Sequence, residues 1–276
     1  MASSETEAQV QAHYGSPQLY EVIFNALQAA GKDMNALTPR DLAPVDQFHS
    51  GGWRSTLALA QMAGISAQDE VLDVGGGIGG PARYIAAELG CKADVLDLSA
   101  EFCEAGEQLT ALLNMSDKVR FKNGSALEIP YPDAHFDVVV TQHSTMNIPH
   151  KETLYSEIAR VLKPGGRLAM HEFMAGATPD GMIFPVPWAR SAEISDLRVP
   201  EHILDYLHSI GLKDIVWHDV TSDTLASFKN QMSEIAGAGP LGLQIVIPDI
   251  QLMIKNLFAN LQAGRVRVIL AVLKRE

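Results

Sequence analysis

Cysteine is scarce in this sequence: of 276 residues only Cys91 and Cys103 are cysteines. This count excludes a disulfide scaffold and a four-cysteine zinc site, and the two thiols are expected to be reduced in a cytoplasmic protein. Long apolar runs are also missing. Because no stretch of about 18 uncharged apolar residues occurs, we expect no membrane-spanning helix. The N-terminal sequence MASSETEAQV has acids where a secretory signal needs a basic end and an apolar core, so we expect no such signal.

Basic residues are fewer than acidic ones, with 21 Lys and Arg against 33 Asp and Glu and a formal net charge of −12. This charge disfavours binding to the phosphates of nucleic acid or of an anionic membrane and leaves a small molecule as the expected partner. The sequence also lacks a His-Glu-x-x-His or Asp-x-Asp cluster, a phosphate-binding P-loop and a Gly-x-Ser-x-Gly elbow. We therefore expect no metal ion and no serine nucleophile.

Short apolar runs alternate with helical patterns from Glu70 onwards. This alternation predicts an α/β fold in which a doubly wound, parallel sheet is covered on both faces. The sequence Pro164-Gly165-Gly166 predicts a turn that ends a helix before the fifth strand. The predicted strands are residues 71–74, 93–98, 119–122, 136–141, 167–173, 215–218 and 265–273.

The residues before the first strand predict a helical cap over 1–64, followed by a main domain over 65–276. Apolar residues recur at helical spacing in 17–30 and 55–63, with a loop between them that Pro39 and Pro44 mark.

A second irregular stretch follows the fifth strand. Residues 174–199 contain three prolines and are longer than an ordinary connection, so they predict a lid. The apolar stretch Leu241–Leu261 predicts a buried amphipathic helix, and the C-terminal helices are compatible with a homodimer.

The stretch VLDVGGGIGG, from Val71 to Gly80, predicts a strand that enters a glycine-rich turn and then a helix. Glycine allows positive φ and close approach of a ligand to the backbone. The pattern contains Gly-x-Gly-x-x-Gly and suits either NAD(P) or S-adenosylmethionine (SAM). Asp97 closes the next strand, where a carboxylate can accept both hydroxyls of a ribose. Asp73 favours SAM, because a carboxylate behind the turn repels a pyrophosphate but holds the methionyl ammonium.

Four segments in this order resemble the motifs of class I SAM-dependent methyltransferases: VLDVGGGIGG, VLDLS, NGSALEIPYPDAHFDVV and ARVLKPGGRLAMHEF. The small-molecule branch, which includes sarcosine/dimethylglycine, sugar O- and ubiquinone-pathway methyltransferases, is the most similar. The resemblance covers roughly residues 46–175. It implies a Rossmann-like sheet of seven strands, mostly parallel with the last strand antiparallel, and SAM as the cofactor.

The resemblance also implies roles for individual residues. The turn would pack under the methionyl part of SAM, Asp97 would bind the ribose, and Leu98 would cover the adenine. Ser125 and Ala126 would lie at the adenine edge, although the family usually has Asp where Ser125 stands. The remaining cofactor candidates are Asp73, Gly75, Gly77, Gly79 and Gln142, and Tyr14 is a candidate to close over the methionyl carboxylate.

Ligands of such sheets bind beyond the carboxyl ends of the strands, so the end of the fourth strand predicts the acceptor site. His143 lies there and is the candidate general base, because an imidazole titrates near neutral pH. The resemblance gives Glu172 as an acid near the substrate. Side chains alternate along a strand, so His171 is the alternative to Glu172 for the residue that points into the site. Further candidates for contact with the acceptor are Phe48, His49, Met146 and Trp188.

The leading hypothesis is an enzyme that transfers a methyl group from SAM to nitrogen or oxygen of a small molecule. Two alternatives stay open: an NAD(P)-dependent oxidoreductase on the same type of fold, and a protein that binds SAM without catalysis. The sequence does not identify the acceptor, since the acidic charge suits an amine and His143 suits a hydroxyl.

Overall fold

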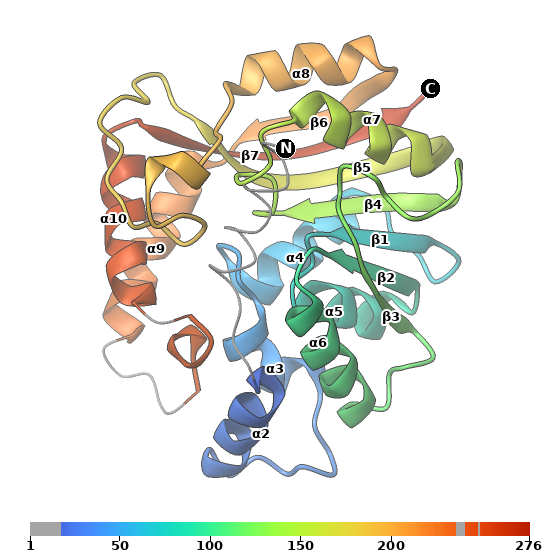
Figure 1. Cartoon of the computed structure of the whole chain (residues 1–276), viewed down its shortest axis with the longest axis vertical. Coiled ribbons are helices and arrows are strands. Elements are labelled where there is room, and N and C mark those ends of the chain that lie inside the picture. The colour runs from blue at the N-terminus through green and yellow to red at the C-terminus, as the bar shows by residue number, and fades with distance from the viewer. Residues whose placement is uncertain (1–17, 236–240, 248) are drawn as a thin grey trace.

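The computed structural model describes residues 18–235, 241–247 and 249–276, which are built around one seven-stranded sheet (Figure 1). The strands lie in the order β3-β2-β1-β4-β5-β7-β6. Their bounds are β1 Glu70–Val74, β2 Lys92–Asp97, β3 Val119–Asn123, β4 Phe136–Gln142, β5 Leu162–Ala175, β6 Leu212–Asp219 and β7 Val266–Arg275.

Strand pairing confirms the predicted direction of the sheet. β1 pairs in parallel with β2 and with β4, and the pairs β2–β3 and β4–β5 are also parallel. β7 is antiparallel to both of its neighbours, β5 and β6. The strand order reverses between β1 and β4, so the carboxyl ends of these strands mark the position at which folds of this type bind ligands.

Helices cover both faces of the sheet. On one face, Ile85 packs in the same apolar cluster as Val71. On the other face, Leu154 and Leu207 pack with Leu72. The adjacent residues Val71 and Leu72 therefore point to opposite faces, as expected for a parallel sheet that is buried on both faces. The helices are α2 Leu19–Ala29, α3 Pro39–Asp46, α4 Gly52–Met62, α5 Gly80–Leu89, α6 Ala100–Leu112, α7 Lys151–Val161, α8 Pro200–Ser209, α9 Thr221–Ile235 and α10 Ile250–Gln262, with short 3-10 turns η1 Ala192–Ile194 and η2 Leu243–Ile245.

The loop predicted around Pro39 and Pro44 is wrong, because the structure has helix α3 there. Pro39 occupies the start of the helix, where a proline loses no intrahelical hydrogen bond. Thr38 and Asp41 form a capping box, in which the Thr38 amide donates to the Asp41 carboxylate at 2.9 Å. These capping contacts outweigh the single interior Pro44 in so short a helix.

The turn predicted at Pro164-Gly165-Gly166 is a bulge within β5 rather than a loop before it. Helix α7 ends at Val161, and β5 begins at the next residue. The register with β4 shifts, since Phe136 pairs with Leu162 and Val138 already pairs with Arg167. Gly165 has a φ of 78°, which suits glycine and lets the extra residues fold out of the ladder.

The connection between β6 and β7 carries α9, η2 and α10, which stand beyond the carboxyl end of β4 (Figure 1). The single helix predicted over Leu241–Leu261 is therefore divided into η2 and α10. Pro248 lies outside the described residues. η2 contacts α3, so this connection reaches the helices that precede the sheet. Within the described part of the chain, no helix combines the length and apolar character needed to cross a membrane.

Candidate active site

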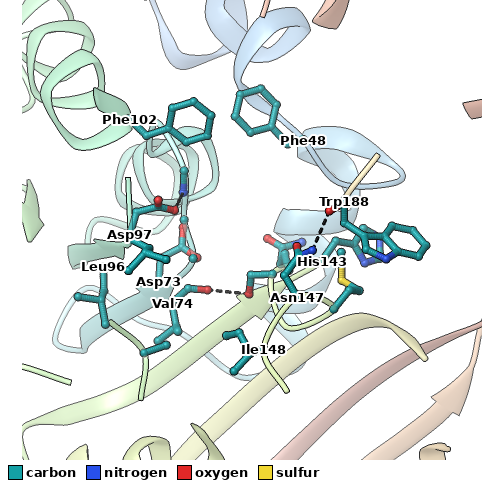
Figure 2. Close-up of a pocket in the computed structure, with 18 of the residues that line it drawn as sticks. Phe48, Asp73, Val74, Leu96, Asp97, Phe102, His143, Asn147, Ile148 and Trp188 are labelled. Atoms are coloured by element: carbon teal, nitrogen blue, oxygen red, sulfur yellow. Dashed lines mark hydrogen bonds between the residues drawn. The ribbon is translucent and has the colours of Figure 1, made fainter. Parts of the chain in front are cut away.

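A pocket opens beyond the carboxyl ends of β1, β2 and β4 (Figure 2). Its other walls come from residues just after α3, from Pro187 and Trp188 in the segment after β5, and from Ile247 after η2. The empty volume is about 1420 Å³ when the space open to solvent is included.

The glycine-rich turn forms the floor of one end of the pocket. Gly75 and Gly77 have φ values of 69° and 58°. A Cβ on Gly75 would lie 2.4 Å from the Ser144 Cβ, and a Cβ on Gly77 would lie 3.3 Å from the Phe48 ring. Only glycine fits both the conformation and the space. Gly79 does not line the pocket; it is the N-cap of α5 and packs against Phe121.

Asp97 lies at the end of β2 and holds the turn in place. One carboxylate oxygen accepts from the Gly77 amide at 2.8 Å, and the other accepts from the Ser99 amide at 2.9 Å. Burial raises the pKa of Asp97, while these amides favour its ionised form. The pocket therefore contains a fixed carboxylate beside the turn.

Asp73 lies below the turn and is 2% exposed. Its Oδ2 has no hydrogen-bond partner among the described residues, and a Cβ on Gly76 would lie 2.6 Å from that oxygen. Burial, together with the charge of Asp97, raises the pKa of Asp73 to about 7. A buried and unpaired carboxylate is costly unless a cationic group binds to it, so this atom marks a site for a cation.

A slot between aromatic and backbone groups adjoins Asp97. Phe48 and Phe102 lie 5.9 Å apart between ring centroids and face one another across this end of the pocket (Figure 2). Leu98, Ser125 and Ala126 line the slot as predicted from the sequence. The Leu127 amide donates to the Ser125 hydroxyl at 3.2 Å, which fixes this edge of the slot.

His143 follows β4 directly and has a φ of 50°, a conformation that is uncommon outside glycine and typical of functional sites. Its Nε2 is hydrogen bonded to the Ser50 hydroxyl at 2.7 Å. Its Nδ1 is buried and has no partner in the described chain. Burial lowers the pKa of His143 well below 6.5, and the neighbouring His171 and His49 lower it further. The ring is therefore neutral at pH 7, with Nε2 hydrogen bonded and Nδ1 left without a partner among the described residues.

His49 and His171 are also neutral. Burial lowers the pKa of His49 to about 4 and that of His171 to about 3. The ring centroids of His171 and His143 are 4.5 Å apart, and His49 lies 6.4 Å from His143. Of the two, only His49 lines the pocket; His171 packs behind His143. No three His, Cys, Asp or Glu side chains in the described ranges are grouped to hold a metal ion.

An aromatic stack forms the wall beside His143. The His143 ring lies parallel to Phe173 at 3.9 Å, and Phe173 stacks on Trp188 at 5.1 Å. The Trp188 indole donates to the Ser195 hydroxyl at 2.9 Å. Met146 lines the pocket on the same side, so the predicted residues His143, Met146 and Trp188 come together.

Comparison with known proteins explains this arrangement. A family model described as a methyltransferase domain matches residues 72–170, which contain the turn, Asp97 and His143. The 27-O-demethylrifamycin SV methyltransferase of Amycolatopsis mediterranei is 31% identical over 215 residues, which are 72% of this chain and 78% of that protein. The chain belongs to the class I SAM-dependent methyltransferases.

Other relatives of this methyltransferase align over a shorter stretch. The sterol 24-C-methyltransferase of Eremothecium gossypii is 41% identical over 116 residues, which are 42% of this chain. The alignment spans only 31% of that relative's own length.

Two solved structures share the fold of this methyltransferase. The geranyl diphosphate C-methyltransferase from Streptomyces coelicolor A3(2), in complex with Mg2+, geranyl diphosphate and S-adenosyl-L-homocysteine, has a TM-score of 0.66 and 21% identity, and 81% of this chain and 79% of that one superpose. The cyclase SpnF has a TM-score of 0.67 and 22% identity, with 94% of each chain covered. The second of these proteins is a cyclase by name, so the fold by itself does not define the reaction.

Glu172 lies outside the pocket lining of the methyltransferase, in contrast to His143. It is completely buried on β5 and accepts hydrogen bonds from the Ser144 and Thr145 amides at 3.2 and 3.3 Å. Burial raises the pKa of Glu172 to about 7. Its carboxylate supports the backbone that follows His143 and does not face the acceptor space. Tyr14 lies outside the described residues.

Gln142 lines the pocket beside His143. Its Oε1 accepts from the Thr56 hydroxyl at 3.1 Å, whereas its Nε2 is buried and has no partner among the described residues. The predicted residue therefore presents an N–H group to the site.

Sequence reasoning missed several residues that shape the methyltransferase site. Ser50 holds His143 although 93 positions separate them. Lys151 is buried at the start of α7 and donates to the carbonyls of Thr145 and Asp196 at 2.9 and 2.8 Å. One signal was present for Lys151, because the helix dipole disfavours a cation at an N-terminus unless it has other partners. The structure also adds Asp46, Phe102, Asn147, Ile148 and Ile247 to the pocket lining.

Proposed function

We propose that this methyltransferase transfers a methyl group from SAM to a nucleophilic atom of a small molecule. The observation that carries the proposal is the pair of carboxylates at the glycine-rich turn, with Asp97 fixed by two amides and Asp73 buried without a partner. SAM carries both a ribose and an ammonium group, a combination that a dinucleotide lacks. The two carboxylates fit these two groups. The glycines leave room for the ligand against the backbone.

The residues present fit SAM along its whole length. Asp97 would accept the ribose hydroxyls, and Asp73 would hold the methionyl ammonium. Gln142 Nε2 would donate to the methionyl carboxylate. The side chains at the slot, from Leu98 to Ala126, would enclose the adenine.

The chain's own residues position the acceptor and remove its proton. Bound SAM supplies a methyl group that its sulfonium already activates. His143 Nδ1 accepts the acceptor's proton, and Ser50 keeps the imidazole oriented through Nε2. The aromatic stack on Phe173 and Trp188 prevents the ring from turning and excludes water.

The alternative as an NAD(P)-dependent oxidoreductase is disfavoured by the position of Asp73. A pyrophosphate at the glycine-rich turn would lie beside a buried carboxylate that has no counter-charge in the described chain. The alternative as a protein that binds SAM without catalysis differs in its products, because it releases no S-adenosylhomocysteine.

Calorimetry and product analysis test the proposed function. SAM is expected to bind, whereas NADH is expected to show no binding and no change in nicotinamide fluorescence. A panel of acceptors is then screened for release of S-adenosylhomocysteine. Binding of NADH without binding of SAM would reject the proposal.

Replacing Asp73 by Asn is expected to weaken SAM binding and to stabilise the unliganded protein at pH 8. The variant loses a charged hydrogen bond worth about 1.5–3 kcal/mol, so the Kd for SAM should rise about tenfold or more. Titration calorimetry measures the first effect and thermal unfolding measures the second.

The stabilising effect has a defined pH range. The pKa of Asp73 is raised from 3.8 to about 7 in the folded protein. Its contribution to the free energy of unfolding is therefore complete below about pH 4 and is lost as the pH rises through 7. Wild type and variant should have similar melting temperatures at or below about pH 4, and the variant should be the more stable at pH 8. Equal melting temperatures at pH 8 would contradict the assignment of the unpaired charge.

Replacing Glu172 by Gln is expected to lower kcat about tenfold and to change the Kd for SAM by less than threefold. The expected loss in kcat corresponds to about 1.4 kcal/mol in the positioning of His143, which is a factor of ten in rate. The side-chain amide of the variant keeps one acceptor oxygen. Its own N–H group, however, lies close to the two backbone N–H groups of Ser144 and Thr145, which donate to the carboxylate in the wild type. Glu172 is thus a positioning residue, and its pKa near 7 should appear as an inflection in the pH profile of kcat. The inflection should disappear in the variant and persist in Glu152→Gln, a change at an exposed residue of α7. A variant with unchanged kcat would remove this role.

The predictions for domain roles, oligomeric state and location remain proposals. Asn147 Nδ2 donates to the carbonyls of Trp188 and Ile194 at 2.7 and 2.6 Å, which supports a lid role for residues 174–199. The division into a cap over 1–64 and a catalytic domain over 65–276, and a homodimer, stay predictions. Cys91 and Cys103 are buried free thiols, which supports a cytoplasmic location.

A further inference from the structure

We propose that the acceptor is an uncharged, largely apolar molecule that presents one hydroxyl group to His143. The inference rests on the proposed function and adds the substrate class. Three features of the pocket carry it: the apolar walls at the acceptor end, the absence of charge from those walls, and the single available nitrogen of His143.

Apolar side chains form the walls of the pocket beyond His143. Met146 follows β4, Phe173 belongs to β5 and Trp188 lies in the predicted lid, and the three side chains pack in one apolar cluster. Met146, Phe173 and Trp188 are 5% exposed or less, so the surface that they present to the pocket belongs to the apolar core. A hydrocarbon body that binds there removes its own apolar surface from water, which is worth about 25 cal/mol per Å².

Permanently charged side chains are missing from the acceptor end. Neither Lys nor Arg lines the pocket within the described part of the chain, and its lining histidines are His49, His143 and the exposed His150. Three carboxylates line the pocket within the described residues. Asp73 and Asp97 lie at the cofactor end, and the Oδ2 of Asp46 is paired with Arg83 at 2.9 Å. Burial keeps His49 and His143 neutral.

The absence of charge restricts the acceptor. An ammonium would lie in a dry space with no carboxylate to pair with, and it would also face the positive sulfonium of SAM. A carboxylate or phosphate would find no cationic side chain in the described walls. Burial of an unpaired charge is strongly unfavourable, so both classes of acceptor are disfavoured.

His143 determines which polar group the acceptor carries. A hydrocarbon alone would leave Nδ1 buried without a partner, whereas a hydroxyl donates a hydrogen bond to it. In the transfer, the hydroxyl oxygen forms a bond to the methyl carbon. The sulfur–methyl bond breaks and its electron pair stays on sulfur, and the hydroxyl proton passes to Nδ1. The products are a methyl ether, S-adenosylhomocysteine and a protonated imidazole that returns its proton to solvent.

Matched acceptors test this inference through binding as well as turnover. Three hydrocarbon bodies (a C10 terpenoid, a steroid and a long-chain phenyl compound) are each used as the alcohol or phenol, the primary amine and the carboxylate. Titrations are followed by tryptophan fluorescence and calorimetry with S-adenosylhomocysteine bound. For at least one body, the hydroxyl member should bind at least tenfold more tightly than its charged partners and should be the member that is methylated.

The outcomes separate this inference from the proposed function. Failure of S-adenosylhomocysteine itself to bind would overturn the proposed function. Normal binding of S-adenosylhomocysteine, combined with preference for a charged member or with no binding of any hydroxyl member, would overturn the inference.

A change of wall charge gives an independent test. Ile148 is half-buried at the pocket wall, so Ile148→Glu is expected to fold and to improve binding of the amine members at least tenfold relative to wild type. The matched control is Ile215→Glu, because Ile215 is 57% exposed on β6 and does not line the pocket. Equal amine binding in Ile148→Glu, Ile215→Glu and wild type would show that wall charge does not select the acceptor.

Discussion

Replacing His143 by Ala is expected to lower kcat by about 10²–10⁴, the usual contribution of a positioned general base, and to change the Kd for SAM by only a few-fold. The loss follows from the geometry, because His143 lines the pocket, its Nδ1 has no partner among the described residues and its Nε2 is held by Ser50. Because the pKa of His143 lies well below 6.5, the base form is present throughout the neutral range. The rate should therefore show no loss from this residue between pH 6 and 8.

Two comparisons make the His143 result specific. Ser50→Ala removes only the hydrogen bond that orients the ring, so its kcat should fall by about tenfold, in keeping with about 1.4 kcal/mol. His171→Ala removes a neighbour that does not line the pocket and should leave the Kd for acceptor unchanged. Full turnover by His143→Ala would leave alignment as the source of catalysis, and equal losses of SAM affinity and rate would make His143 a cofactor ligand.

Replacing Asp97 by Ala is expected to raise the Kd for SAM by about 10²-fold or more. Two hydrogen bonds to the ribose would be lost, each worth about 1.5–3 kcal/mol when one partner is charged. The same carboxylate accepts from the Gly77 and Ser99 amides, so the turn also loses its support. Titration calorimetry with SAM measures the change.

Asp97→Asn separates the two roles of the carboxylate. The amide keeps one acceptor oxygen and should restore part of the affinity that Ala loses. Glu101→Ala, at an exposed position in the first turn of α6, is the control for net charge and should bind SAM like wild type. An unchanged Kd in Asp97→Ala would contradict the ribose assignment.

The cofactor end of the site was predictable because its signals are local in the sequence. The turn, Asp73 and Asp97 lie within 25 consecutive residues (73 to 97), and strand periodicity alone places both acids at carboxyl ends of adjacent strands. The order of strands and helices followed from the same alternation. Helix α3 was missed because residue propensity alone predicts a loop where two prolines occur. In the structure, the capping contacts of this helix outweigh that propensity.

The acceptor end was less predictable because its contacts are distant in sequence. Nothing near His143 indicates that Ser50 binds its ring. Alternation along β5 correctly separates His171 from Glu172, but both faces of a central parallel strand are buried, so alternation does not identify the face toward the ligand. Neither His171 nor Glu172 lines the pocket, whereas Phe173 does.

The origin of the pocket walls has a consequence for how this protein can change. Its cofactor residues fall within residues 72–170, the range that the methyltransferase family model matches. Phe173 and Trp188, which form the wall beside His143, both lie outside that range. Substitutions or exchanged segments there can alter which molecule is methylated without touching the atoms that hold SAM. New substrate preferences are therefore accessible by evolution or engineering in steps that keep the catalytic cofactor site intact.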